Sequence, residues 1–376
     1  NPNIVWLEHM TRPIPKKTIA DLPFLPPPMM AEPDAMLIDG DLRLNLNEAP
    51  IPPSQKTISA MTKALVEVGK YPDHSCDALQ TVLSDRLGVS KDQLFFGGGS
   101  AELLLATSLI AIDPGDEVIV PVPTFPTFGK GVAVSGGRSI GVPVNEFGIN
   151  DVKAMVTAIT PNTRVVYACT PNNPTGGLLN SDDIVYLSQS VPDDILLLVD
   201  EAYHEFGAYD GGADCLEILS ERTGLWAITR TFSKAYSMAG MRAGYGIASS
   251  ARLAMGYHKV RGNFTINRVA IAGAVAAYKD TDHRDLYLTE NAHQRNRLSQ
   301  GLEKLGFTPF TSSANFVTAQ SPQPTEGMVV HLGENHILVQ ALTWPGVGPC
   351  LRIGVGNNDN ITTLLMVLKN YLSGHE

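Results

Sequence analysis

Residues 195–203 have the sequence ILLLVDEAY, a short apolar run that ends on two carboxylates, Asp200 and Glu201. A continuous apolar run of this length is typical of a strand buried on both faces of a sheet. Four further runs have the same character, namely QLFFG (93–97), EVIVP (117–121), RVVYAC (164–169) and LWAIT (225–229). Each is ended or followed by Gly, Pro, Asp or Thr. The sequence therefore predicts five buried strands.

Helical patterns lie between these strands, for example at residues 101–112 and 181–190. Strands that alternate with helices are typical of a mainly parallel sheet with helices on both faces. The pattern changes after about residue 279. Residues 285–305 form a long, polar-faced helical pattern closed by Gly306, and short strand patterns follow around 316–318, 337–340 and 351–355. This part predicts a smaller α+β unit.

The predicted fold class is α/β, with a large domain built on a mainly parallel sheet and a smaller α+β domain. We predict three parts in the chain. Residues 1–45 form an N-terminal arm that belongs to the small domain, residues 46–279 form the large domain, and residues 280–376 form the C-terminal small domain. The opening contains a dense group of prolines at 22–33, which favours an extended arm.

Composition excludes several classes of protein. Lys and Arg number 28 against 38 Asp and Glu, a net charge of −10, which argues against binding a nucleic acid. The longest unbroken apolar run, 269–278, is shorter than the roughly 18 residues of a membrane span. Four cysteines stand far apart without a CxxC pair, so we predict no disulfide framework and no metal site. A cytoplasmic location is the simplest expectation.

The ends of the predicted strands hold the candidate binding groups, because parallel strands gather such groups at their carboxyl ends. A carboxylate such as Asp200 at the end of a buried strand needs hydrogen bonds or a cationic partner. Capping the next helix is an equally good interpretation. After 93–97, Gly98, Gly99 and Ser100 open a helix, which favours an anion such as phosphate. A glycine-rich turn without a ligand is the alternative.

Two more strand ends hold candidate binding groups, and the first of them suits a phosphate with an amine beside it. Thr231, Ser233, Lys234 and Arg242 follow the strand at 225–229. A lysine among cationic or apolar neighbours can form a Schiff base, although a solvated basic turn is the alternative. After 164–169 comes TPNNPTG (170–176), whose asparagine amides offer donors and acceptors. A purely structural turn is the alternative there.

The order of these four segments resembles that of the fold-type-I pyridoxal-phosphate enzymes, specifically the class I/II aminotransferases. Longer stretches resemble the histidinol-phosphate aminotransferase branch: LNLNEAP (44–50), KYPD (70–73), DEAYHEF (200–206), TRTFSKAYSMAGMRAGYG (229–246) and LRIGVG (351–356). The resemblance extends from about residue 44 to the C-terminus. It implies the fold of PLP-dependent transferases of type I and pyridoxal 5'-phosphate as cofactor.

The resemblance also implies roles for individual residues. Lys234 would hold the cofactor covalently and, once displaced by substrate, act as the general base. Asp200 would pair with the pyridinium nitrogen, and Asn173 and Tyr203 would hydrogen-bond the ring hydroxyl. Ser100, Ala101, Thr231, Ser233 and Arg242 would bind the phosphate, and Phe125 would stack on the ring or pack in the core. Tyr71 would reach the phosphate of a neighbouring subunit, which implies a homodimer with shared active sites.

On the substrate side, Arg352 would clamp the α-carboxylate, and Asn47, Gln340 and Phe24 would lie near the substrate. The related enzymes usually have an arginine in an ILVR pattern where this chain has ILVQ (337–340). Their early tyrosine aligns with Phe24. Both differences remove groups that meet a substrate phosphate, at a cost of about 3–5 kcal/mol for a broken buried pair. We therefore expect a substrate without phosphate.

The expected function is a PLP-dependent aminotransferase that acts on an L-amino acid or related amine with a 2-oxo acid partner. Elimination, cyclisation or racemisation of an amino acid on the same scaffold is the alternative, because the scaffold does not fix the reaction. A non-enzymatic ligand-binding protein is disfavoured because Lys234, Asp200, Asn173, Tyr203 and Arg242 are all present.

Overall fold

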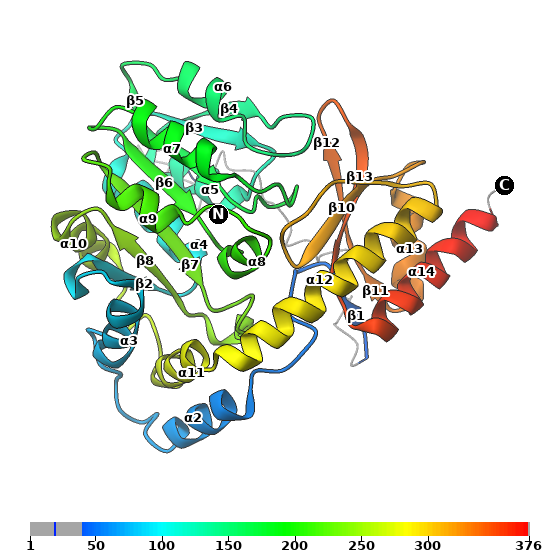
Figure 1. The fold of residues 1–376 in the computed structure, drawn as a ribbon, viewed down its shortest axis with the longest axis horizontal. Helices are drawn as coiled ribbons and strands as arrows, with labels where there is room; N and C mark the ends of the chain where they lie inside the picture. The colour runs from blue at the N-terminus through cyan, green and yellow to red at the C-terminus, as the bar shows by residue number, and fades with distance from the viewer. Residues whose placement is uncertain (1–18, 20–39, 375–376) are drawn as a thin grey trace, which may run out of the picture.

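The computed structural model describes residue 19 and residues 40–374. Phe24 and nearly all of the predicted N-terminal arm lie outside these residues. Figure 1 shows a large sheet with its helices and, beside it, a smaller sheet with α13 and α14. Helix α12 (Thr281–Lys304) runs from the end of α11 (Arg268–Lys279) towards the smaller sheet. The predicted limits of the domains stay a prediction.

The large sheet has seven strands. Their spatial order is β2 (Leu94–Gly97), β8 (Gly244–Ala248), β7 (Trp226–Thr231), β6 (Leu196–Asp200), β5 (Thr163–Cys169), β3 (Glu117–Val122) and β4 (Arg138–Pro143). Only β8 is antiparallel to its neighbours in this sheet. The α/β fold with a mainly parallel sheet is therefore confirmed, and the five predicted strands correspond to β2, β3, β5, β6 and β7.

Strands β4 and β8 were not among those predicted. Strand β4 lies at the sheet edge and is mostly exposed, so it lacks the continuous apolar run of a buried strand. Strand β8, GYGIA, contains glycines, which are unfavourable in strands. A Cβ added at Gly246 would lie 2.2 Å from the Phe95 ring, so this close packing requires glycine.

Alternate residues of the strands pack against helices on opposite faces. Tyr167, Leu198 and Ala227 contribute to one core cluster, with side chains from α4 (Ser100–Ala111), α5 (Pro126–Ser135) and α10 (Ala251–Val260). The intervening residues face the other cluster. That cluster includes side chains from α3 (Asp77–Leu87), α6 (Val152–Thr157), α7 (Ser181–Ser190), α8 (His204–Tyr209), α9 (Cys215–Ser220) and α11. This alternation buries both faces of the sheet.

The smaller unit contains a four-stranded antiparallel sheet. Its order is β12 (Gln340–Trp344), β13 (Gly348–Gly354), β10 (Phe316–Gln320) and β9 (Thr308–Pro309). A separate parallel pair joins β1 (Leu42–Arg43) to β11 (Ile337–Leu338). Helices α13 (Glu326–Glu334) and α14 (Asn358–Ser373) pack with α12 over a core of their own. Helix α12 begins at Thr281, earlier than predicted.

Helix α2 (Gln55–Leu65) lies side by side with α11 at the lower edge of Figure 1. The four cysteines are free and buried. Within residues 40–374, no helix is both long and apolar enough to cross a membrane.

Candidate active site

The site begins at the carboxyl ends of three neighbouring strands. Asp200 is the last residue of β6 and lies opposite Cys169 of β5 and Thr229 of β7. Its carboxylate is 1% exposed. It accepts hydrogen bonds from the Tyr167 hydroxyl at 3.1 Å, the Thr229 hydroxyl at 3.2 Å and the Ala202 N–H at 3.2 Å. The residue that caps α8 is Tyr203, so the capping role considered for Asp200 is excluded.

Burial raises the pKa of Asp200 to about 6, although the three hydrogen bonds oppose this shift. A carboxylate in this position is costly to keep charged without a cation beside it. The end of β6 therefore offers a strong acceptor for a cationic ring nitrogen.

Lys234 follows β7 in the chain, and its side chain contacts the segment around residues 46–47. Its Nζ donates to the main-chain oxygens of Leu46 at 3.0 Å and Asn47 at 2.9 Å. Burial lowers the pKa of Lys234 to about 7, and the nearby charges of Arg352 and Arg242 lower it further. At neutral pH a large share of this amine is unprotonated, which makes it available as a nucleophile or base.

Asn47 connects Lys234 to two other segments. Its carbonyl also accepts from the Asn315 side chain at 3.0 Å, and its side-chain amide donates to the Tyr203 hydroxyl at 2.9 Å. The backbone of Asn47 is left-handed, with φ of 55°, a conformation that asparagine tolerates better than most residues. Burial raises the pKa of Tyr203 to about 12, so its hydroxyl remains protonated at neutral pH.

A candidate anion site, here called the phosphate pocket, lies at the start of α4, where Ser100 and Ala101 are the first two residues. The helix begins after Gly99, whose φ is 87°, and it has no side-chain cap. This φ favours glycine, and a Cβ at Gly99 would lie 2.4 Å from Nη2 of Arg242, so the guanidinium would have to move. Uncapped N–H groups at a helix start suit an anion.

Side chains that follow β7 complete this pocket. The Arg242 guanidinium donates to the Ser233 hydroxyl at 3.1 Å and to the Gly98 carbonyl at 2.9 Å. The Thr231 hydroxyl donates to that of Ser233 at 2.9 Å. The structure thus brings together all five residues predicted to bind phosphate, and a guanidinium with hydroxyls and helix N–H groups is a donor set suited to a phosphate.

Arg352 of β13 is buried near Lys234. Its two terminal nitrogens donate to the Asn173 side chain and to the Asn45 carbonyl, each at 2.6 Å. Its Nε is buried and has no partner among the described residues. Strand pairing places Gln340 directly opposite Arg352. The Gln340 Oε1 atom is also buried without a partner in the described part of the chain.

Phe125 and Tyr71 lie in different settings. Phe125 caps α5 and is partly buried against the core cluster on that face of the sheet. Tyr71 is 79% exposed, and its ring stacks on Phe264 with the centroids 4.6 Å apart. Phe24 lies outside the described residues.

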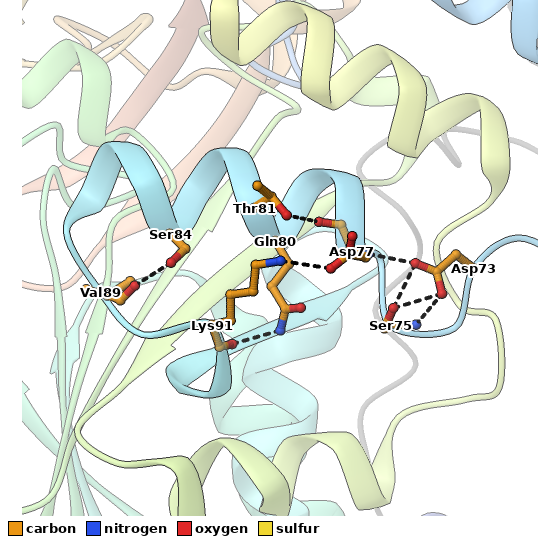
Figure 2. A network of polar contacts seen from close by, with 8 residues as sticks. All are labelled: Asp73, Ser75, Asp77, Gln80, Thr81, Ser84, Val89 and Lys91. Atoms are coloured by element: carbon orange, nitrogen blue, oxygen red, sulfur yellow. Dashed lines mark hydrogen bonds and ion pairs between the residues drawn. The ribbon is translucent and has the colours of Figure 1, made fainter.

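The turn that presents Tyr71 is held by Asp73. Figure 2 shows the Asp73 carboxylate accepting from the Ser75 N–H at 3.1 Å and, at the start of α3, from the Asp77 N–H at 2.7 Å. These bonds lower the pKa of Asp73. The turn is thereby fixed in shape ahead of the helix, with Tyr71 on the surface.

Sequence reasoning missed three polar residues of the site: Tyr167, Thr229 and Asn315. Tyr167 precedes Cys169 by two positions, so the strand period alone places it on the same face as Asp200. Thr229 is the cross-strand neighbour of Asp200. Tyr167 and Thr229 could have been predicted from the strand pairing. Nothing in the sequence around Asn315 indicates its place in the site.

Comparison with known proteins shows the family to which this chain belongs. A model of the family described as aminotransferase class I and II matches residues 40–368. The chain is 35% identical over 335 residues to histidinol-phosphate aminotransferase 1 of Nitrosococcus oceani, which covers 89% of this chain and 90% of that protein. It is 34% identical over 343 residues to histidinol-phosphate aminotransferase of Roseobacter denitrificans, with 90% and 94% covered.

Solved structures agree with these matches. The histidinol-phosphate aminotransferase of Sinorhizobium meliloti, crystallised in complex with pyridoxal-5'-phosphate, superposes with a TM-score of 0.84 at 27% identity. The match covers 89% of this chain and 92% of that one. Aspartate aminotransferase of Thermotoga maritima gives a TM-score of 0.77 at 21% identity, with 89% and 92% covered, a likeness of fold alone.

The donor set fits pyridoxal phosphate. The pocket at the start of α4 suits its phosphate, the buried Asp200 carboxylate suits its ring nitrogen, and the Lys234 amine suits its aldehyde. The chain therefore belongs to the class I and II aminotransferases, in the histidinol-phosphate aminotransferase branch, and its cofactor is pyridoxal 5'-phosphate.

Proposed function

We propose that this aminotransferase moves an amino group from an L-amino acid, or a related amine, to a 2-oxo acid, and that its substrate has no phosphate. The cofactor supplies an electron sink for the carbanion formed at the substrate α-carbon. Ser100, Ala101, Thr231, Ser233 and Arg242 bind its phosphate. Asp200 pairs with its ring nitrogen, Asn173 and Tyr203 bind its ring hydroxyl, and Phe125 packs on its ring.

Lys234 carries the proton in this proposal. Its depressed pKa leaves a neutral amine near pH 7, which can accept the proton of the α-carbon and return it to another atom. The carbonyls of Leu46 and Asn47 bind this amine and give it a resting position within the site. Lys234 therefore serves first as the covalent anchor and then as the general base.

Arg352 orients the substrate. Two of its terminal N–H groups donate to protein oxygens, and Nε has no partner among the described residues, which leaves this N–H for a carboxylate. Burial makes such a charge-assisted bond strong and fixes the amine relative to Lys234. The Asn47 side-chain amide donates to the Tyr203 hydroxyl, and the Asn47 carbonyl accepts from Lys234.

Gln340 is the observation that supports a substrate without phosphate. It lies opposite Arg352, at the position where the resemblance to the histidinol-phosphate aminotransferases implies an arginine. A neutral amide offers no charge to a buried phosphate dianion, and its Oε1, which has no partner within the part of the chain that the structure describes, is an acceptor for a donor group. Substrate tails with an ammonium, guanidinium or amide group, or with an aromatic ring, suit this position.

A panel of amino donors tests this proposal. The enzyme is mixed with each donor and a 2-oxo acid, and kcat/KM is measured for histidinol phosphate and for amino acids with cationic, amide or aromatic side chains. We expect one of these amino acids to exceed histidinol phosphate by at least about tenfold. Efficient turnover of histidinol phosphate alone would refute the assignment made to Gln340.

We also propose that the enzyme is a homodimer in which Tyr71 completes the partner's phosphate site. Exposed apolar side chains, here called the apolar patch, support this: Tyr71 (79% exposed) stacks on Phe264 (37%), and Leu65 (53%), Val66 (84%) and Val68 (58%) precede Tyr71 in the chain. Contiguous exposed apolar surface is typical of a protein interface. The Thr265 hydroxyl bonds to Glu102 in the first turn of α4, so the patch adjoins the phosphate pocket.

Subunit complementation tests the shared site. Tyr71→Ala and Lys234→Ala are purified separately, mixed and allowed to exchange subunits. One site of the hybrid dimer then combines a native Lys234 with a native Tyr71 from the other subunit. We expect the mixture to exceed the summed activity of the two variants, and activity that stays at that sum after proven exchange would contradict sharing.

A further inference from the structure

Tyr167 is a fully buried tyrosine whose hydroxyl donates a hydrogen bond to Oδ2 of Asp200 at 3.1 Å. Its position follows from strand register. Cys169 pairs with Asp200, and Tyr167 precedes Cys169 by two residues, so all three side chains lie on one face of the sheet. The Tyr167 ring packs against Phe128 of α5 with the centroids 4.9 Å apart, which fixes the direction of the hydroxyl.

The two carboxylate oxygens of Asp200 have different hydrogen-bond partners. Oδ1 accepts from Thr229 and from the Ala202 N–H, whereas Oδ2 accepts from Tyr167 alone among the described residues. A carboxylate oxygen can accept two bonds, so Oδ2 keeps one acceptor position for a ligand. The Tyr167 phenol can donate to Oδ2 only when that oxygen carries no proton, either because the carboxylate is ionised or because the proton is on Oδ1.

We propose that Tyr167 is a positioning residue of the cofactor site, whose hydroxyl fixes the orientation of the Asp200 carboxylate and keeps it anionic for the ring nitrogen of pyridoxal phosphate. It acts only through Asp200. Removing the hydroxyl removes one of three donors to a buried anion, which disfavours the anion and makes protonation easier.

Other titratable groups near Asp200 do not substitute for Tyr167. The Cys169 thiol lies on the same face, and burial raises its pKa, so it stays neutral. Glu201 is adjacent in the chain, but its carboxylate is paired with Arg230 at 2.8 Å and contacts His204 at 3.2 Å. Tyr203 directs its hydroxyl to the Asn47 side chain.

The test compares Tyr167→Phe with Tyr257→Phe in the full-length protein. Tyr257 is an equally buried tyrosine in the same core cluster, and its hydroxyl bonds to Thr107 at 2.8 Å, so its loss costs stability without touching Asp200. After removal of the cofactor, the dissociation constant of pyridoxal phosphate is measured by absorbance across the pH range in which Asp200 titrates.

We expect Tyr167→Phe to bind pyridoxal phosphate about tenfold more weakly at neutral pH, and the acidic limb of its pH profile to move up by about one unit. Tyr257→Phe should match the unmodified protein. An unchanged profile for Tyr167→Phe, or the same change in Tyr257→Phe, would overturn the proposal.

Two further measurements separate positioning from a general loss of structure. In an Asp200→Asn background the limb due to Asp200 should be absent, and adding Tyr167→Phe should leave the affinity for pyridoxal phosphate unchanged; a further loss of about tenfold would overturn the proposal. Replacing Tyr167 with a ring-fluorinated tyrosine keeps the ring and strengthens the donor. This change should move the limb down, and a limb that does not move would count against the proposal, even if Tyr167→Phe fails to fold.

Discussion

The ε-amino nitrogen of Lys234 lies 2.9 Å from the main-chain oxygen of Asn47, a residue 187 positions earlier in the chain. Asn47 at the same time binds Tyr203 through its side chain and accepts from Asn315 of the smaller unit. One residue with a left-handed backbone thus connects the reactive amine, a ring-binding tyrosine and the smaller unit. The position of the amine therefore depends on the packing of the segment around residues 45–47.

Lys234→Ala should abolish transamination. The amine is both the covalent anchor and the base, so we expect a loss of more than about a thousandfold in kcat. Pyridoxal phosphate should still bind noncovalently through the phosphate pocket and Asp200, as measured by absorbance after gel filtration. Lys153→Ala, at an exposed position on α6, is the matched control and should retain full activity. Full activity of Lys234→Ala would disprove the assignment.

Asp200→Asn should stabilise the cofactor-free protein while weakening cofactor binding. Burial raises the pKa of Asp200 to about 6, so above that pH the native state holds a charged group that the unfolded chain solvates more favourably. We expect urea unfolding at pH 7 to show a gain of about 3 kcal/mol at most. This gain should fall as the pH drops from about 6 towards the ordinary value for aspartate.

The order should reverse with cofactor present, because binding stabilises the native state of the unmodified protein more. If Asp200→Asn is less stable than the unmodified protein without cofactor at pH 7, burial of Asp200 is not the unfavourable interaction described above.

Gln340→Arg should confer activity on phosphorylated substrates. A guanidinium at this position would face a substrate phosphate beside Arg352, and we expect kcat/KM for histidinol phosphate to rise by about tenfold or more. Gln340→Met has a similar length without charge or amide and serves as the control. A similar rise with methionine would show that space, rather than charge, limits the native enzyme.

Ser237→Gly should stabilise the protein. Ser237 follows Lys234 in a turn with φ of 56°, a left-handed conformation that costs a non-glycine residue roughly 1–2 kcal/mol. Its hydroxyl oxygen is buried and has no partner among the described residues. Allowing for the flexibility of glycine in the unfolded chain, we expect a net gain of about 1 kcal/mol in urea unfolding.

Ser237→Ala separates the two contributions, because it removes the hydroxyl but keeps the strained Cβ. The glycine variant should be the more stable of the two. Equal stabilities would mean that the turn stores no strain at this position.

The sequence was sufficient to predict the strand that ends in Asp200 and the strand that Lys234 follows. Buried parallel strands have a continuous apolar pattern, and the polar residue that ends each of them is visible in the chain. Strand β8 was not predictable in the same way, because the need for Gly246 comes from the Phe95 ring of a strand distant in sequence. Glycine is otherwise a signal against a strand.

Contacts between segments far apart in the chain could not be predicted from the sequence pattern either. Nothing local to Asn47 indicates that its carbonyl binds Lys234, or that the carbonyl of Asn45 binds Arg352. Such contacts depend on how the smaller unit packs on the larger one. The placement of Gln340 opposite Arg352 likewise required the register of β12 and β13.

The most direct test of the proposed reaction is a single-turnover experiment with the purified holoenzyme and the best amino donor, without any 2-oxo acid acceptor. Transamination predicts release of one equivalent of 2-oxo acid per active site, followed by a stop that only an added acceptor relieves. Continued product formation without an acceptor would indicate elimination or cyclisation, and a change of configuration without 2-oxo acid would indicate racemisation. Either result would contradict the account.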